Sequence, residues 1–425
     1  MIAALQPFRS RSFRYQWPAD LCAAWALEME TLVLGWYVLT ESGSVLLLTV
    51  FGALQYVGTL VSPMLGAIGD RIGLRNLLAA MRLCYALCAA TLLLLAATGR
   101  LDPWAVLAVS AVCGLVRPSD IGMRTALVGA TVPSGDLAAA MGIARTTMDS
   151  AKIGGALAGA GVMAGFGMAP AYLMVTILHL AGVFLTLKIE GGRHPGRSAT
   201  PLSSQQIDQP PAAAPPRTSP WRDLREGLVY VWRTPHLLAA MSVAALVNLT
   251  AYPITNGLLP YVAREVFRMN QQGLGWLVAS YAAGALAGSL LMSTIGPSVR
   301  PARMMLGAAA FWFLSLIAFA HAPGPGAGMA LLACAGGAQS LSMIAVQVML
   351  IRTTEPRLRG RIMGVRMLAI YPLPLGLLLA GAAIPAIGYH ATVTILPIAG
   401  LLLAAAIAFA WREALLPEAA AANAR

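Results

Sequence analysis

Long apolar stretches recur along the whole chain and constrain its fold more than any other feature. About twelve of them run close to 20 residues, the length that an α-helix needs to cross a membrane. Of the 425 residues, 58% are hydrophobic and 11% are charged, which leaves too little polar surface for a soluble protein of this length. Ala, Leu and Gly dominate the stretches, and this favours packed helices over barrel strands. The sequence predicts an all-α integral membrane protein.

The expected membrane spans form two sets of six. They lie near 17–40, 45–68, 77–98, 103–127, 137–163 and 169–188, and near 236–261, 273–296, 303–321, 327–351, 361–387 and 391–411. Residues 191–220 are rich in Pro, Ser, Gln and Ala, as in a flexible linker. We expect three parts: an N-terminal six-helix bundle over 1–190, a cytoplasmic linker over 191–235 and a C-terminal six-helix bundle over 236–425.

The end of the linker has the pattern of an amphipathic helix. Over 221–233, apolar residues share one helical face and Arg and Glu lie elsewhere. Such a helix is expected either to lie on the inner membrane surface or to serve as the lead-in to the seventh span.

Basic residues gather on one side of the expected spans. The N-terminus and the segments 70–75, 188–235, 300–303 and 352–361 are rich in Arg, whereas 41–44, 165–168, 321–326 and 388–390 contain no Lys or Arg. By the positive-inside rule, both termini are expected in the cytoplasm. The same rule accounts for the net charge of +12, so we expect no nucleic-acid partner. The composition favours a bacterial inner membrane.

The two halves of the chain repeat each other. Pro133, Met141-Gly142 and Ala158-Gly159 correspond, with one gap, to Pro356, Met363-Gly364 and Ala380-Gly381. Duplicated six-span units are typical of transporters that bind substrate between two bundles, near the middle of the membrane.

A charged, glycine-rich turn is expected between the second and third spans, over residues 66–75. With the twelve spans and the central linker, it resembles the major facilitator superfamily, whose loop at this place reads roughly G-x-x-x-D-R-x-G-R-R. The matching residues are Gly66, Asp70, Arg71, Gly73 and Arg75. The stretches 40–44, 221–233 and 356–364 look like the enterobactin-exporter and macrolide-efflux branch.

The resemblance implies a fold and a function. The fold is two pseudo-symmetric six-helix bundles around a central cavity, with the five matching turn residues as a conformational latch. The implied function is alternating-access transport of a small amphipathic molecule, as a proton-coupled exporter of siderophore or drug type. A lysolipid or amphiphile transporter, and a non-transporting sensor on the same fold, remain alternatives. The expected partners are the substrate, protons and membrane lipid, and the protein is expected to be a monomer.

Ionisable residues within the expected spans are functional candidates, because charge at membrane depth is costly. Arg117, Asp120 and Arg124 share one face of the fourth span, and Arg145, Asp149 and Lys152 form a similar stripe on the fifth. These spans run antiparallel, so residues at equal depth predict the cross-pairs Asp120–Arg145 and Arg117–Asp149. They would form a structural ion network or a switch whose pairs exchange.

Two carboxylates of the first span cannot both face one cavity. Glu28 and Glu30 are two residues apart, roughly 200° around a helix. One is expected to face the cavity, where it could carry a proton, and the other to pack against a neighbouring helix. The candidates for proton coupling are Glu28, Glu30, Asp120 and Asp149.

The candidates for the wall of the substrate cavity are cationic, amide and aromatic residues at membrane depth. They are Trp25, Arg117, Arg145, Lys152, Asn248, Tyr252 and Tyr371. Their charge leaves an anionic or a zwitterionic substrate open, and each aromatic residue could equally serve in packing or as an interface anchor.

Motifs of enzymes are missing from the sequence. It contains no Walker P-loop and no nucleophile elbow, and its five cysteines fall inside expected spans without metal-ligand spacing. We expect neither an enzyme nor a cofactor or metal.

Overall fold

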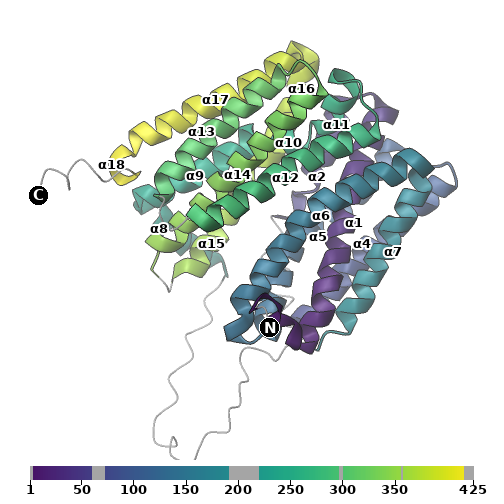
Figure 1. Ribbon diagram of the computed structural model, residues 1–425, viewed down its shortest axis with the longest axis horizontal. Coiled ribbons are helices and arrows are strands. Elements are labelled where there is room, and N and C mark those ends of the chain that lie inside the picture. The colour runs from purple at the N-terminus through teal and green to yellow at the C-terminus, as the bar shows by residue number, and fades with distance from the viewer. Residues whose placement is uncertain (1–2, 60–71, 191–219, 296–299, 356–357, 416–425) are drawn as a thin grey trace, which may run out of the picture.

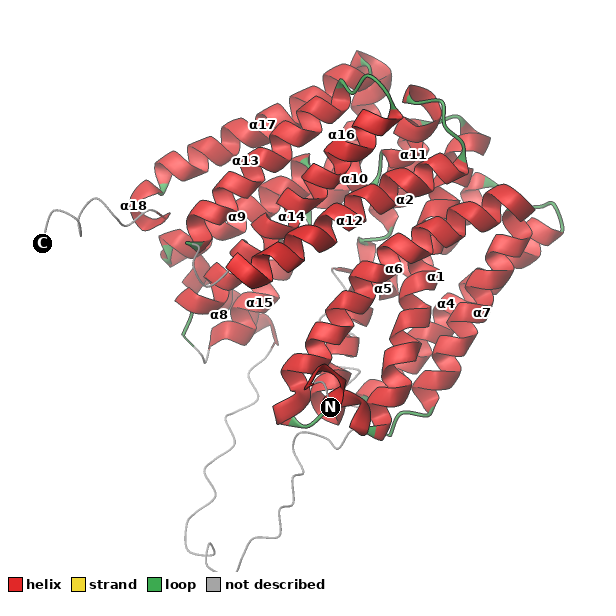
Figure 2. Ribbon diagram, in the orientation of Figure 1, coloured by secondary structure: helices red, strands yellow, loops and turns green. Residues whose placement is uncertain are grey.

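The computed structural model describes residues 3–59, 72–190, 220–295, 300–355 and 358–415, and the regular elements in these ranges are all helical (Figure 2). The first half contains α1 (Arg11–Ser42), α2 (Val45–Leu54), α4 (Leu74–Ala97), α5 (Pro103–Thr131), α6 (Leu137–Phe166) and α7 (Met168–Leu187). The second half contains α8 (Pro220–Arg233), α9 (Pro235–Thr250), α10 (Tyr252–Asn256), α11 (Leu259–Tyr261), α12 (Gln271–Ile295), α13 (Pro301–Ala320), α14 (Pro325–Thr353), α15 (Arg359–Leu368), α16 (Pro372–Ile387), α17 (Tyr389–Ala410) and α18 (Arg412–Leu415).

Nine helices of the described residues are long and apolar enough to cross a membrane. Of the other three expected spans, the fifth corresponds to α6, which carries Arg145, Asp149 and Lys152, and the second and seventh correspond to shorter helices. The second span continues from α2 and the short turn Val57–Thr59 into residues that lie outside the described ranges. The seventh is divided into α9, α10, α11 and a π-helical turn over Val262–Val266. Proline near the start of α10 and of α11 cannot donate the backbone hydrogen bond of a continuous helix.

Local sequence explains where several helices begin and end. The N–H of Gly43, in the left-handed region at φ 63°, donates to the carbonyl of Leu39 and closes α1. The carboxylate of Asp102 accepts from the N–H of Ala105 at 2.6 Å, and Pro103 follows as the first helical residue of α5.

The helices form two groups that lie side by side. Figure 1 shows α1, α4, α6 and α7 on one side, and α9, α13, α14 and α17 on the other. Within the first group α1 packs against α6 and α7, and within the second α14 packs against α12 and α13. Small residues permit these approaches: a Cβ atom on Gly284 of α12 would lie 1.9 Å from the carbonyl oxygen of Ala333 in α14.

The most extensive contacts between the groups are those of α6 with α12 and of α2 with α16. A Cβ atom on Gly275 of α12 would lie 2.7 Å from that of Ala160 in α6. A Cβ atom on Gly381 of α16 would lie 1.8 Å from Oγ1 of Thr49 in α2. The glycines therefore set how closely the two groups can approach.

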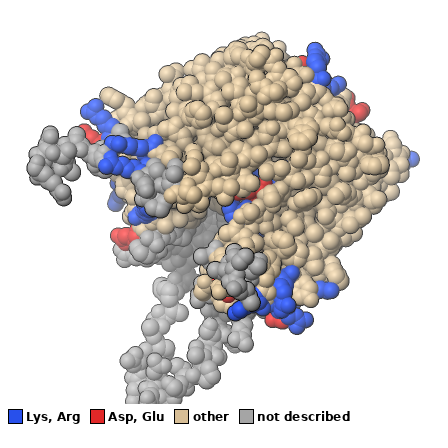
Figure 3. All heavy atoms as spheres, viewed as in Figure 1, with Lys and Arg blue, Asp and Glu red and all other residues tan. Residues whose placement is uncertain are grey.

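Charge is nearly absent from a broad band of the surface. On the face drawn in Figure 3, Lys and Arg lie toward the ends of the helices, and the band between them is almost free of charge. Exposed large apolar side chains, such as Leu87, Phe184 and Leu402, belong to this chain's long helices. A membrane accounts for such exposure, which would be costly in water.

Candidate functional site

A cavity of about 1340 Å³ lies between the two groups of helices. Helices α1, α2, α5 and α6 line it from the first group, and α10, α11, α12 and α15 line it from the second. In Figure 3 a few blue and red atoms are visible in the hollow between the groups. The cavity is large enough for a drug-sized molecule.

The two groups of helices contact each other at one end of the cavity, and α11 forms that end. A Cβ atom on Gly35 of α1 would lie 3.3 Å from Cγ of Pro260. Beyond it, Nη1 of Arg264 donates to the carbonyl of Leu39, in the last turn of α1, at 2.9 Å. Cations are favoured at helix C-termini, so this bond stabilises contact between the groups.

The charged stripes of α5 and α6 pair within each helix. Asp120 forms an ion pair with Arg124, and both side chains are almost fully buried. Nε of Arg145 lies 3.1 Å from Oδ2 of Asp149. The expected cross-pairs Asp120–Arg145 and Arg117–Asp149 are therefore wrong. Each acid has a base four residues along its own helix, a spacing that needs no contact between helices.

Another ion pair joins three helices of the first group. Arg82 of α4, which is fully buried, contacts the carboxylate of Asp20 in α1 and the hydroxyl of Thr186 in α7. Asp20 also lines the cavity. The sequence shows both charges, but their partnership depends on how α1 and α4 pack.

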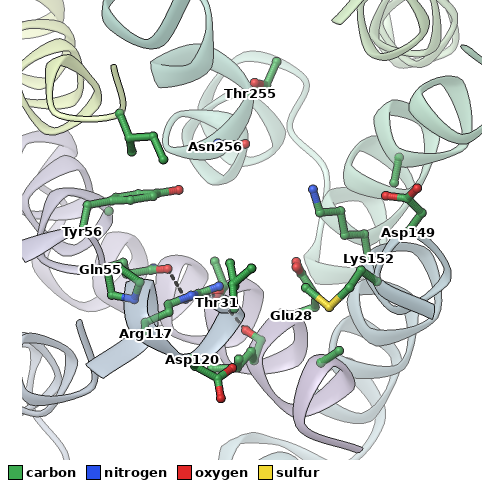
Figure 4. A pocket seen from close by; sticks show the side chains of 18 of the residues that line it. Glu28, Thr31, Gln55, Tyr56, Arg117, Asp120, Asp149, Lys152, Thr255 and Asn256 are labelled. Carbon is green, nitrogen blue, oxygen red and sulfur yellow. Dashed lines mark hydrogen bonds between the residues drawn. The ribbon is translucent and has the colours of Figure 1, made fainter. Parts of the chain in front are cut away.

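Three charged side chains of the cavity have no oppositely charged partner among the described residues. Figure 4 shows Glu28 and Lys152 reaching into the cavity from α1 and α6. Arg117 donates to Oγ1 of Thr31 at 3.2 Å and to the side-chain oxygen of Gln55, and both partners are neutral. These three groups are available to a substrate or a proton.

Glu30 lies on another side of α1, away from the cavity. Its Oε2 is 3.8 Å from Nε2 of the fully buried His179 in α7. The ring centroid of His179 lies 5.5 Å from that of Tyr85 in α4. Glu30 is thus enclosed by first-group helices, whereas Glu28 faces the cavity.

Three expected wall residues pack between helices instead. Trp25 lies against Gly154, where a Cβ atom would be 2.6 Å from Cζ2 of the indole. The side chain of Asn248 donates to a carbonyl of its own helix at 2.8 Å. The hydroxyl of Tyr252 accepts from Nε2 of Gln339 at 2.8 Å. None of these three side chains is among the residues that line the cavity.

The remaining expected wall residues do line the cavity. They are Arg117, Arg145, Lys152 and Tyr371. The polar residues Gln55, Thr255 and Asn256, which the sequence did not point to, also line it. Gln55 follows α2, and Thr255 and Asn256 belong to α10. Neither helix carries a charged residue that could have marked its cavity face.

The turn before α4 is described only in part. Gly66, Asp70 and Arg71 lie outside the described residues. Gly73 has a φ of 88°, which favours glycine, and immediately precedes α4. Nη1 of Arg75 donates to the carbonyl of Ile189, just after α7, at 3.1 Å. The contact of Arg75 that is described thus lies within the first half.

The two walls of the cavity differ in charge. All the charged lining residues that the structure describes come from α1, α5 and α6. The second group supplies hydroxyl, amide, aromatic and aliphatic groups, among them Thr255, Asn256, Leu274, Tyr281 and Met367. Within the described ranges, no three His, Cys, Asp or Glu residues are placed to hold a metal ion.

Comparison with curated proteins finds transporters. The chain is 31% identical over 187 residues to the multidrug efflux pump Tap of Mycolicibacterium fortuitum, which covers 43% of this chain and 45% of that protein. It is 28% identical over 187 residues to the enterobactin exporter EntS of Escherichia coli O1:K1 / APEC, and this match covers 44% of this chain and 41% of EntS. The matches thus span less than half of the length of these relatives.

Solved structures share the fold over nearly the whole chain. A point mutant of the nucleoside transporter NupG matches with a TM-score of 0.73 and 14% identity, over 94% of this chain and 100% of that one. A bacterial homologue of the human lysosomal transporter Spinster, inward-facing and unoccupied, matches with a TM-score of 0.69 and 14% identity, over 97% and 98%.

The sequence of the chain also matches the model of a protein family. The model described as Major Facilitator Superfamily matches residues 19–270 and 241–425. With its long apolar helices, the chain is a multi-pass membrane protein. This protein belongs to the Major Facilitator Superfamily, whose members are membrane transporters and not enzymes.

Proposed function

We propose that the protein exports an amphipathic small molecule from the cytoplasm. The observation that carries the proposal is the cavity with one charged and one uncharged wall. Arg117 and Lys152 exceed Glu28 by one charge among the unpaired lining groups, which favours a substrate with an anionic or zwitterionic end. The printed functions of the relatives, multidrug efflux and enterobactin export, support an outward direction.

We further propose that transport proceeds by alternating access in a bacterial inner membrane. In this proposal the two groups of helices are six-helix bundles, formed by 1–190 and 236–425, with 191–235 as the cytoplasmic linker. The Arg-rich segments support twelve spans with both termini in the cytoplasm. The contacts of Gly35 with Pro260 and of Arg264 with Leu39 then close the outer end, and they must separate for release.

Glu28 is our candidate for the proton carrier. It lines the cavity, and no described residue neutralises it. Among the other candidates, Asp120 and Asp149 have partners on their own helices, and Glu30 faces His179. A proton on Glu28 would change the charge of the cavity by one unit, which would couple protonation to release of the charged end of a substrate.

Efflux from proteoliposomes tests both parts of the proposal. The purified chain is reconstituted and loaded with a fluorescent amphipathic anion, and efflux is followed with and without an imposed pH gradient. We expect gradient-driven efflux in the natural protein. Glu28→Gln should abolish the response to the gradient while substrate exchange at equal pH continues.

Glu41→Gln is the matched control, because Glu41 is an exposed acid at the far end of the same helix. It should behave as the natural protein. Binding of the anion without flux in any condition would reject transport in favour of a sensor, and full gradient response of Glu28→Gln would reject this residue as the carrier.

A further inference from the structure

A second cavity, of about 400 Å³, lies at one end of the second group of helices. Helices α9 and α13 begin at it, and α14 ends there. Its lining residues are His236, Arg300, Pro301, Ala302, Arg303, Met349, Arg352, Thr353, Ala414 and Leu415. None of them lines the large central cavity. This smaller cavity is therefore a separate place on the molecule, which we name the basic cavity.

Positive charge dominates the basic cavity. Arg300, Arg303 and Arg352 line it, together with His236, and no Asp or Glu is among its described lining residues. Arg300 and Arg303 also interact with other groups of the chain. Nε2 of His236 is buried and has no hydrogen-bond partner within the described residues. The arginines place positive charge around a cavity that has no carboxylate among its described lining residues, and this favours an anion there.

The backbone adds to this positive field. Pro235 and Pro301 stand at the starts of α9 and α13, and neither helix has a side-chain hydrogen bond to cap its N-terminus. Helix N-termini carry partial positive charge and attract anions. The end of α14 carries the opposite sign, but Arg352 lies in its last turn. Two helix starts and the guanidinium of Arg352 thus outweigh one helix end.

We propose that the basic cavity binds a phosphate group, carried either by the headgroup of an anionic phospholipid or by free phosphate. Guanidinium groups bind phosphate oxygens in a bidentate manner, and basic pockets between membrane helices bind phosphorylated headgroups. The volume corresponds to about a dozen water molecules, at ~30 Å³ each, so a polyatomic anion fits. Met349, Ala414 and Leu415 provide an apolar side for the glycerol and first acyl carbons of a lipid.

The inference needs the membrane placement of the chain but not its transport activity. The test therefore measures binding. The full-length chain is placed in phosphatidylcholine nanodiscs with and without phosphatidylglycerol, and retained lipid is counted by native mass spectrometry. In a second arm, phosphatidylcholine nanodiscs are titrated with inorganic phosphate against chloride at equal ionic strength, and the shift in Tm is recorded.

The test variant is the triple change Arg300→Gln, Arg303→Gln and Arg352→Gln. Its matched control is Arg412→Gln, since Arg412 lies in α18 near the same cavity but stacks 5.2 Å from the ring of Phe409. We expect the triple variant to retain one phosphatidylglycerol fewer and to bind it about tenfold or more weakly, as the loss of charge-assisted hydrogen bonds requires. Arg412→Gln should match the natural chain.

Each outcome decides the proposal. If inorganic phosphate produces a saturable Tm shift that the triple variant loses, while both chains retain the same amount of phosphatidylglycerol, the ligand is free phosphate and not lipid. If the triple variant keeps the affinity of the natural chain for both anions, the proposal is overturned. Should the triple variant fail to fold, Arg352→Gln and the triple lysine variant, which keeps the charge but not the bidentate geometry, must both show weakened binding. Efflux by the triple variant is also measured in phosphatidylcholine liposomes. This measurement distinguishes a loss of anion binding at the basic cavity from a loss of transport.

Discussion

At the scale of residues, the charged side chains at membrane depth fall into two sets. The residues of the pairs Asp20–Arg82 and Asp120–Arg124 are buried, and each forms an ion pair with its partner. Glu28, Arg117 and Lys152 instead face the central cavity without a described partner of opposite charge. Burying charge is tolerable when it is paired, so the first set is expected to serve stability and the second to serve transport.

Breaking the Asp20–Arg82 pair should destabilise the first group of helices. Arg82→Gln leaves the carboxylate of Asp20 without its cation, and removing one partner of a buried pair costs about 3–5 kcal/mol. Thermal unfolding in detergent should show a marked fall in Tm. Arg100→Gln, at an exposed position beyond α4, is the control and should change little. An unchanged Tm in Arg82→Gln would show that the pair contributes no net stability.

Lys152 should select for the charge of the substrate. Lys152→Gln removes a cation from the charged wall without disturbing a described ion pair. We expect efflux of a fluorescent anion to fall about tenfold or more relative to that of its neutral analogue, since a charged hydrogen bond contributes about 1.5–3 kcal/mol. Equal losses for the anion and the analogue would indicate a general defect and contradict the assignment.

At the scale of elements, the sequence predicted most helices but not their partners. Hydrophobic length was enough for spans such as α12, α13 and α17, because a helix must satisfy its backbone within itself in lipid. It was not enough for Trp25, Asn248 and Tyr252, whose orientation depends on which neighbour each helix meets. The i,i+4 ion pairs of α5 and α6 could be predicted from spacing along one helix. The predicted cross-pairs were wrong because that spacing does not give the distance between two helices.

Glycine at the α2–α16 contact should be more important than glycine elsewhere. Gly381→Ala places a Cβ atom against Thr49, so Tm should fall and transport should slow as α16 moves away from α2. Gly307→Ala in α13 is the matched control, because a Cβ atom there meets nothing within 4 Å. Alanine is favoured over glycine in a helix, so the control should be neutral or stabilised by up to about 1 kcal/mol. Equal shifts in Tm for the two variants would argue against tight contact.

At the scale of the whole molecule, contacts between the groups gather at the end where α6 meets α12 and Arg264 meets α1. The sequence could suggest two similar halves through its repeat, but it could not show which end of the cavity is closed. That outcome depends on the balance of many contacts between the groups and not on any one motif. A transporter that alternates must exchange these contacts for others at the opposite end.

A disulfide at this end should stop the cycle. In a background without the five native cysteines, Ala160→Cys and Gly275→Cys place two thiols where α6 and α12 nearly touch. Oxidation should abolish efflux, and reduction should restore it. Each single cysteine variant should be insensitive to oxidant. Undiminished efflux by the cross-linked protein would show that this end need not open.

The division of charge between the two walls has a consequence for how such a transporter could diversify. Substitutions that alter α1, α5 or α6 would change which ionic forms of a compound are accepted, because the lining charges reside there. Substitutions in α12 or α15 would change the tolerated bulk and shape of the compound. Selection on a library of toxic amphiphiles should therefore recover two separate sets of mutants, one sorted by the acidity of the compound and one by its size.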